Sequence, residues 1–123
     1  MAPMDDIFVY KLLTDDQWRA AEASGVTDVP VDREDGYVHL SSSKQLALTL
    51  HLYFRELNNV VLLEINTENI KSKLTFEEDI SGKRSGKFPH LYGKLLTTDI
   101  SNDWNIERKG FNLPEKVLFE AED

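Results

Sequence analysis

Two histidines, His39 and His90, lie far apart in the sequence, and each is close to a tyrosine. An imidazole titrates near neutrality and can donate or accept a hydrogen bond, so the pair suits proton transfer or hydrogen bonding to a ligand. The chain has no cysteine, no two histidines four residues apart, and its third histidine, His51, lies in a different setting. We therefore expect a ligand site without a metal.

The first of these histidines falls in a segment, residues 35–43, that begins with an Asp-Gly turn signal and ends in three serines. Side chains alternate along a strand, so Tyr37, His39 and Ser41 would share one face and the apolar residues between them the other. Ser42 would then begin a helix as its cap. The polar face could do chemistry, or it could be an edge strand that only meets water, and the pattern leaves both open.

A carboxylate and a cationic loop follow later in the chain. Glu77 ends a predicted strand at residues 74–77, and the loop over residues 78–87 contains Lys83 and Arg84. A carboxylate beside His39 would stabilise a cationic transition state, as carboxylates do in oxocarbenium chemistry. Backbone amides and cations in such a loop can hold a phosphate. A surface carboxylate and a solvated loop are the open alternatives.

Composition narrows the class of protein. A chain of 123 residues that is 41% hydrophobic is expected to form one domain, residues 7–119, between an N-terminal tail (1–6) and an acidic tail (120–123). The net charge of −8 argues against binding to bulk nucleic acid or to anionic membranes. No apolar run approaches the roughly 20 residues that span a bilayer. We expect a cytoplasmic monomer that binds a small molecule.

The elements that would position these residues can be predicted from periodicity and caps. Helices are predicted at residues 15–24 and 43–55, and residues 26–34, which contain Pro30, are predicted to be a loop. The most apolar run, residues 60–65, should be a central strand. Further strands are predicted at residues 8–13, 74–77, 94–97, 104–109 and 117–119. Strands outnumber helices and both helices fall in the first half, so the class is α+β with small mixed or antiparallel sheets.

At these residues the sequence resembles a known family. The motifs Asp-Gly-Tyr-Val-His-Leu-Ser at residues 35–41 and Phe-Pro-His-Leu-Tyr-Gly at residues 88–93 resemble the domain of unknown function 952 (DUF952) family. The resemblance extends over about residues 7–106. It implies a fold similar to that of the ADP-ribosyltransferases, in which two small sheets surround a cleft that holds NAD.

The resemblance also implies roles for individual residues. His39 would occupy the position of a strand histidine that contacts NAD, Tyr53 would stack on a ring, and His90 or Glu77 would approach the position that fixes the ribose. The second motif departs from a transferase glutamate motif, since it reads Pro-His-Leu-Tyr. The resulting hypothesis is an enzyme acting on NAD or a related nucleotide at the ribose C1. Its catalytic residues would be His39, His90 and Glu77, and its binding residues Tyr37, Ser41, Ser42, Tyr53, Lys83, Arg84 and Tyr92.

Two alternatives stay open. The first is a non-catalytic module on the same fold that binds a small metabolite or a protein. The second is purely structural: both histidines are interior hydrogen-bonding groups, and replacing His39 or His90 by alanine lowers the free energy of unfolding by about 1–3 kcal/mol. A site for a ligand requires instead that the two imidazoles meet in one place that solvent can reach.

Overall fold

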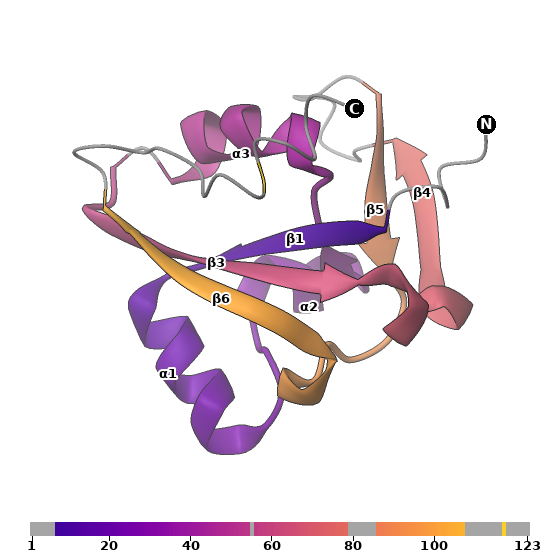
Figure 1. The fold of residues 1–123 in the computed structure, drawn as a ribbon, viewed down its shortest axis with the longest axis horizontal. Helices are drawn as coiled ribbons and strands as arrows, with labels where there is room; N and C mark the ends of the chain where they lie inside the picture. The colour runs from indigo at the N-terminus through magenta and orange to yellow at the C-terminus, as the bar shows by residue number, and fades with distance from the viewer. Residues whose placement is uncertain (1–6, 55, 79–85, 108–116, 118–123) are drawn as a thin grey trace.

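The computed structural model describes residues 7–54, 56–78, 86–107 and 117 (Figure 1). The predicted tails at 1–6 and 120–123 lie outside these residues, as does the predicted strand at 117–119 apart from the buried Val117. The main elements are β1 (Phe8–Leu13), α1 (Asp15–Ser24), α2 (Pro30–Asp35), β2 (Val38–His39), α3 (Leu46–Tyr53), β3 (Asn59–Asn66), β4 (Leu74–Glu78), β5 (Lys87–Leu91) and β6 (Ile100–Glu107).

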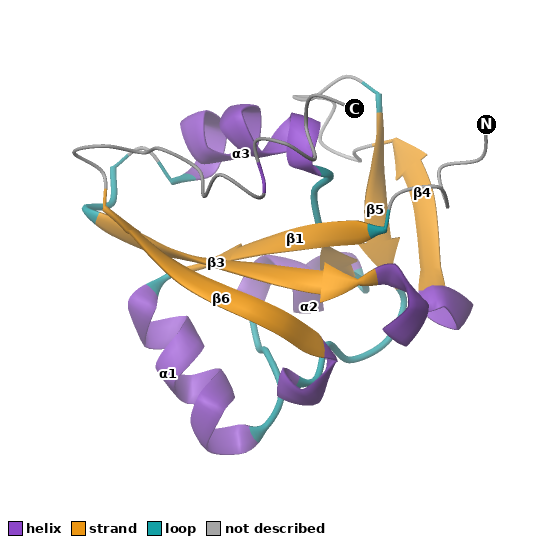
Figure 2. Ribbon diagram, in the orientation of Figure 1, coloured by secondary structure: helices purple, strands orange, loops and turns teal. Residues whose placement is uncertain are grey.

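The strands form two three-stranded sheets, one in the order β1-β3-β6 and one in the order β2-β5-β4 (Figure 2). We call them the large sheet and the small sheet. Every strand pair in them is antiparallel. The α+β class with small sheets is confirmed, and of the two expected arrangements the antiparallel one is found.

Strands β1 and β3 of the large sheet are buried on both faces, because α1 and α3 lie on opposite sides of the sheet (Figure 1). Along β3, Val61 and Leu63 belong to one core cluster, whereas Val60 and Leu62 belong to the other. A strand covered on both faces reads as a continuous apolar run rather than an alternating one. The prediction of a central strand at residues 60–65 is confirmed, since β3 lies between β1 and β6.

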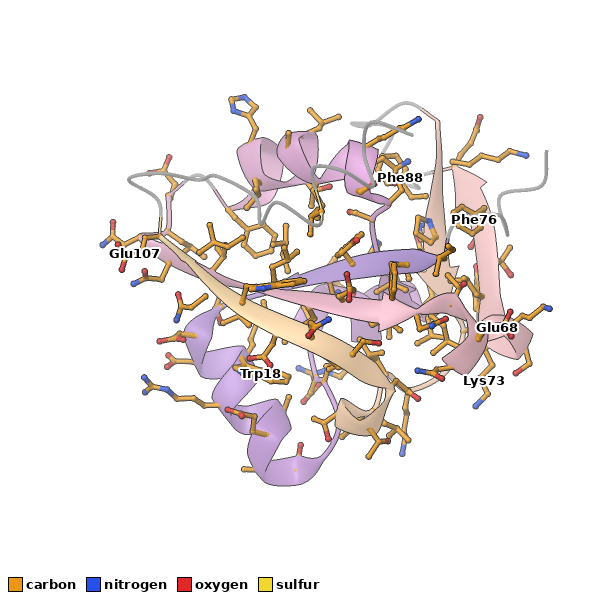
Figure 3. All side chains as sticks on the ribbon, viewed as in Figure 1. Trp18, Glu68, Lys73, Phe76, Phe88 and Glu107 are labelled. Atoms are coloured by element: carbon orange, nitrogen blue, oxygen red, sulfur yellow. The ribbon has the colours of Figure 1, made fainter. Side chains whose placement is uncertain are left out.

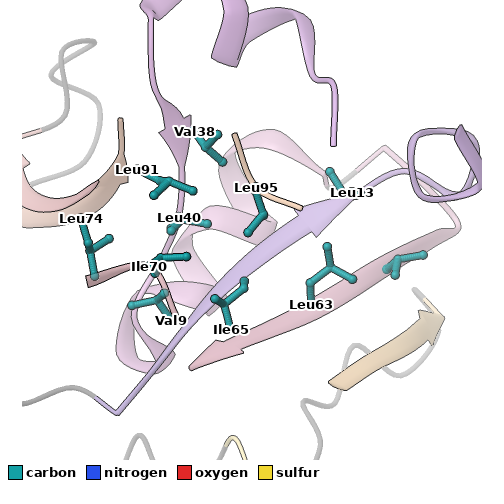
Figure 4. Packing of buried hydrophobic residues seen from close by; sticks show 11 residues of the cluster. Val9, Leu13, Val38, Leu40, Leu63, Ile65, Ile70, Leu74, Leu91 and Leu95 are labelled. Atoms are coloured by element: carbon teal, nitrogen blue, oxygen red, sulfur yellow. The ribbon is translucent and has the colours of Figure 1, made fainter. Parts of the chain in front are cut away.

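One face of the small sheet packs into an apolar cluster shared with the large sheet. Val38 of β2, Leu74 of β4 and Leu91 of β5 are buried in the same cluster as Val9 and Ile65 of the large sheet (Figure 4). Burying a side chain of this size stabilises the fold by about 1.5–3 kcal/mol. The sheet is thereby held by one face, and the residues between these positions point to the other face.

The two predicted helices form, and the predicted caps explain why. Thr14 and Gln17 make the capping box that begins α1, and Gly25 ends it with a φ of 86°. Trp18 packs from α1 against the core (Figure 3). The second helix begins as a 3₁₀ turn, Ser43–Gln45, continues as α3 and ends at Tyr53, two residues before the predicted end.

Two local predictions are wrong. Residues 26–34 are not all loop, because α2 begins at Pro30; proline suits the first turn of a helix, where its missing N–H has no partner to lose. Residues 94–97 are not a strand: Leu96 makes only an isolated bridge with Val26, and β6 begins at Ile100. The polar start of β6 resembles a turn in sequence, but it is an exposed strand paired with β3.

Within the described ranges, no helix combines the length and the apolar character that crossing a membrane requires.

Candidate functional site

The register of the small sheet brings the two histidines together. His39 of β2 lies directly opposite His90 of β5, and Thr75 of β4 lies opposite His90 on its other side. Directly opposed residues of an antiparallel pair project to the same face of a sheet. The centroids of the two imidazole rings are 5.5 Å apart, and the rings meet edge to face at 73°. Both histidines therefore lie on the face of the small sheet opposite Val38 and Leu91.

Tyrosine rings complete the group. The Tyr37 ring is stacked on His90 with centroids 4.1 Å apart, and it lies 4.7 Å from His39 and 5.4 Å from Tyr92. Aromatic pairs at such distances contribute about 0.5–1.5 kcal/mol beyond their buried area. Tyr37 is buried, whereas Tyr92 is 46% exposed. We call the set Asp35, Tyr37, His39, Glu77, His90 and Tyr92 the polar-face cluster.

Each imidazole of the cluster is hydrogen-bonded to a carboxylate. His39 Nε2 lies 2.8 Å from Asp35 Oδ2, and His90 Nδ1 lies 2.8 Å from Glu77 Oε1. An ionised carboxylate only accepts hydrogen bonds, so in each pair the ring nitrogen is the donor. His39 thus carries a proton on Nε2 and His90 carries one on Nδ1. The two pairs hold their rings in opposite tautomers.

The Glu77 carboxylate also accepts a hydrogen bond from the Tyr92 hydroxyl on the same oxygen. The pKa of Glu77 is lowered, first by the bond from Tyr92 and then by the bond from His90, and the same contact with Glu77 raises the pKa of Tyr92 to about 12. At neutral pH Glu77 is therefore an anion and Tyr92 a neutral phenol. The Glu77 side chain is 37% exposed, so this edge of the cluster reaches solvent.

His39 is neutral at physiological pH. Burial is the main cause that lowers the pKa of this imidazole, and the negative charges of Asp32 and Asp35 oppose it without overcoming it. Its side chain is 18% exposed. His39 can thus exchange hydrogen bonds with a bound molecule without carrying a charge.

His90 is more deeply buried, with a side chain only 1% exposed. Its Nδ1 is bonded to Glu77, but its Nε2 has no hydrogen-bond partner among the residues that the structure describes. Buried side-chain polar atoms are mostly paired in native proteins, and an unpaired one is a feature that asks for an explanation.

A buried ion pair outside the cluster holds the backbone of His39. Lys11 Nζ of β1 lies 2.7 Å from Asp32 Oδ2 of α2, and it also donates to the His39 carbonyl oxygen at 2.9 Å. Asp32 Oδ1 accepts the His39 backbone N–H at 3.1 Å. Both backbone groups of His39 are therefore fixed by this pair.

Sequence reasoning missed Lys11, Asp32 and Asp35 as residues of this region. A signal existed for Lys11, which interrupts the otherwise apolar end of the first strand and must find a partner when buried. Asp32 lies on α2, in a stretch predicted to be a loop, so nothing placed its carboxylate near the histidine strand, and Asp35 was interpreted only as part of the turn before that strand.

The other predicted site residues divide into two groups. Ser41 and Ser42 are engaged within the fold: Ser41 Oγ lies 3.0 Å from Thr49 Oγ1, and the Ser42 N–H donates to Gln45 Oε1 at 2.9 Å. The Tyr53 side chain, Lys83 and Arg84 lie outside what the structure describes. In the described part of the chain, no three or more His, Cys, Asp or Glu side chains gather so that they could hold a metal ion.

Comparison with known proteins places the chain among uncharacterised relatives. The profile of the family described as "Protein of unknown function (DUF952)" matches residues 12–102. The crystal structure of protein CC0527 from Caulobacter crescentus is 34% identical, with a TM-score of 0.73 over 81% of this chain and 86% of that chain. The solution NMR structure of CC0527 is 33% identical, with a TM-score of 0.72 over 82% and 85%. No curated protein matches the chain.

Proposed function

The chain belongs to the DUF952 family of proteins of unknown function, and from its geometry we propose that the polar-face cluster binds a nucleotide, with NAD as the first candidate, and acts at the ribose C1. The reaction would be transfer of ADP-ribose to an acceptor or hydrolysis to ADP-ribose. The fold class, two small antiparallel sheets with few helices, is compatible with the ADP-ribosyltransferase architecture, and that finer assignment is part of the proposal.

One observation carries the proposal: two imidazoles, each hydrogen-bonded to a carboxylate, and two tyrosines gather on the face of the small sheet opposite the apolar cluster. The opposite face, with Val38 and Leu91, already anchors the sheet to the core. Polar groups that are buried or half-buried cost free energy unless they are fully paired, and proteins tend to retain such costs at functional sites. A binding site explains why this cost is kept.

The charges of the cluster favour one end of NAD over the other. Asp35 and Glu77 are acidic, and the lowered pKa of His39 means that this imidazole does not offset the charge of Asp35. The nicotinamide ring of NAD is cationic, whereas its pyrophosphate is anionic. Opposite charges attract and like charges repel across a poorly screened site. NAD would therefore place its nicotinamide–ribose end on the cluster and its phosphates beyond it.

The chemistry at the ribose would use Glu77. When the bond between C1 and the nicotinamide nitrogen lengthens, positive charge develops on the ribose, and a fixed carboxylate stabilises it. The hydrogen bonds from Tyr92 and His90 hold the Glu77 carboxylate in place and ionised. The half-exposed Tyr92 ring offers a surface on which the nicotinamide can stack.

A second candidate is a binding module without catalysis on the same face. The observation that favours it is that the side chains of the site already contact one another. Tyr37 is stacked on His90, and Glu77 is hydrogen-bonded to both His90 and Tyr92. A ligand would then be recognised by the exposed edge of the cluster, His39 and Tyr92, without a reaction.

The two candidates are separated by measuring binding and turnover together. Calorimetric titration with NAD gives affinity, and chromatography of free nicotinamide gives turnover, for the wild type, Glu77→Gln and His39→Ala. An enzyme should lose about 100-fold in kcat in Glu77→Gln, the typical cost of removing one group that stabilises a transition-state charge, and a smaller factor in NAD affinity. A module should release no nicotinamide and should lose affinity in His39→Ala.

A matched control is His51→Ala, which removes an exposed imidazole from α3 and should change neither quantity. The absence of both binding heat and nicotinamide release at millimolar NAD would overturn the proposal.

A further inference from the structure

The neighbours of His90 determine whether its Nε2, which has no hydrogen-bond partner among the described residues, carries a proton. Nδ1 of the same ring lies 2.8 Å from Glu77 Oε1. Glu77 also accepts from Tyr92, so its carboxylate has two donors and is stabilised as an anion. The proton of a neutral His90 therefore lies on Nδ1, and Nε2 has a free lone pair in the plane of the ring.

That lone pair restricts what Nε2 can bind. A neutral imidazole nitrogen without a proton accepts hydrogen bonds and cannot donate one. Phosphate and carboxylate oxygens are acceptors as well, so they cannot pair with it. Hydroxyl groups and water can, because they supply an O–H.

The neighbouring rings are arranged so that the lone pair is not already used. Tyr37 stacks on the face of the His90 ring, with an interplanar angle of 23°, and so covers the π surface rather than the in-plane nitrogen. His39 meets His90 edge to face, and its own Nε2 is bonded to Asp35. Since the His90 side chain is only 1% exposed, a hydroxyl can reach Nε2 only if groups around the ring shift on binding.

We infer that His90 is the general base of the site, that Glu77 positions it, and that the group it activates is a hydroxyl, either of an alcohol acceptor or of water. This inference rests on the proposed function and defines the class of its second substrate. Glu77 would serve both the ribose cation and the imidazole, because its second oxygen makes neither of the two bonds to His90 and Tyr92.

The hydroxyl oxygen bonds to the ribose C1 while the bond from C1 to the nicotinamide nitrogen breaks. The electron pair of the broken bond returns to the nicotinamide ring, which leaves as a neutral molecule. The hydroxyl proton passes to His90 Nε2, and the resulting imidazolium, which Glu77 stabilises through Nδ1, later gives that proton to solvent.

The first experiment needs no ligand. A long-range ¹H–¹⁵N correlation spectrum of the protein at neutral pH distinguishes protonated from unprotonated ring nitrogens. It should show His90 protonated on Nδ1 alone in the wild type, and Glu77→Gln should reduce this preference while the His51 signals stay unchanged. A His90 that is protonated on Nε2, or on both nitrogens, would overturn the inference even if NAD binds.

The second experiment tests the role in turnover. NAD is supplied with methanol as a small alcohol, and the products are separated into nicotinamide, ADP-ribose and methyl ADP-ribose. His90→Gln should lower the rate by about 10²–10⁴-fold with NAD affinity kept, the usual contribution of a general base. His90→Asn is the second variant if the first does not fold. An unchanged rate in a folded variant that binds NAD would contradict the assignment.

The two failures can be told apart. If NAD neither binds nor reacts, the proposed function fails, and the tautomer of His90 in the free protein is still measured. If NAD reacts but His90→Gln reacts equally fast, the proposed function stands and His90 is not its base.

Discussion

Two pairs of polar side chains lie next to β2, and they differ in burial and in how many of their polar atoms are hydrogen-bonded. Lys11 and Asp32 have side chains that are 5% and 8% exposed, and they bond to each other and to both backbone groups of His39. His90 is even less exposed, but one of its nitrogens lacks a described partner, and its carboxylate, Glu77, reaches solvent.

This difference distinguishes a structural pair from one that we propose takes part in ligand binding. A fully paired buried network rigidifies the groups around it, and removing either partner leaves an uncompensated charge. A buried group that lacks one of its hydrogen bonds lowers the stability of the fold, and a bound ligand can supply the missing hydrogen bond. We therefore assign Lys11–Asp32 to positioning His39, and His90–Glu77 to the ligand.

The largest expected effect comes from breaking the supporting pair. Asp32→Asn should lower the free energy of unfolding by about 3–5 kcal/mol, because Lys11 is left buried without its counterion. Urea denaturation measures the loss.

The matched control is Asp28→Asn, which breaks the equally short but exposed pair of Asp28 with Arg33 (2.7 Å, with both side chains more than 60% exposed). Its cost should be about 0–1 kcal/mol. Similar losses in the two variants would show that burial does not distinguish the pairs.

The next test replaces His90 by an apolar ring. His90→Phe removes the unpaired nitrogen and keeps a ring under Tyr37, so the free energy of unfolding should stay within about 1 kcal/mol of the wild type or rise. His90→Leu is the second variant, because phenylalanine is slightly larger than histidine. If His90 were only an interior hydrogen-bonding group, both variants would instead lose about 1–3 kcal/mol.

The pH dependence of stability should report on His39. Its pKa is lowered from 6.5 in the folded protein, so below pH 6.5 the unfolded chain takes up a proton first. Stability should therefore fall as the pH drops below 6.5 and should level out below the lowered pKa. His39→Gln should flatten this part of the curve in urea titrations between pH 7 and pH 5. An unchanged slope would show that His39 is not the titrating group.

The smallest effect is expected at the exposed edge. Tyr92→Phe removes the hydrogen bond that contributes most to lowering the pKa of Glu77, so this pKa should rise towards its ordinary value of 4.5. When folding lowers the pKa of a carboxyl group, the stability gained is fully present above the ordinary pKa and is lost as the pH falls through the folded pKa. Tyr92→Phe should therefore lose the stability that comes from Glu77 at a higher pH than the wild type does. A ¹³C titration of the Glu77 carboxyl checks the shift directly.

Part of this architecture could be predicted from the sequence because it depends on local patterns. The capping box at Thr14, the apolar run of β3 and the alternation through Tyr37 and His39 are properties of neighbouring residues. The alternation correctly placed Tyr37 with His39, and Val38 and Leu40 in the core, whereas Ser41, predicted on the same face as His39, bonds to Thr49.

The rest depends on contacts between distant segments. The pairing of His39 with His90 follows from the register of β2 and β5, which no local pattern specifies. The same holds for Asp35, which was interpreted only as part of a turn, and for Glu77, which was expected beside His39 but bonds to His90. The polar start of β6 was missed because partner strand β3, rather than its own composition, makes it a strand.

The central claim is that the polar face of the small sheet is where a nucleotide binds, and backbone chemical-shift mapping with NAD tests it most directly. We predict that the perturbed amides cluster at Tyr37 to His39, at Glu77 and at His90 to Tyr92. Perturbations that fall on the large sheet instead, or none at millimolar NAD, would contradict it.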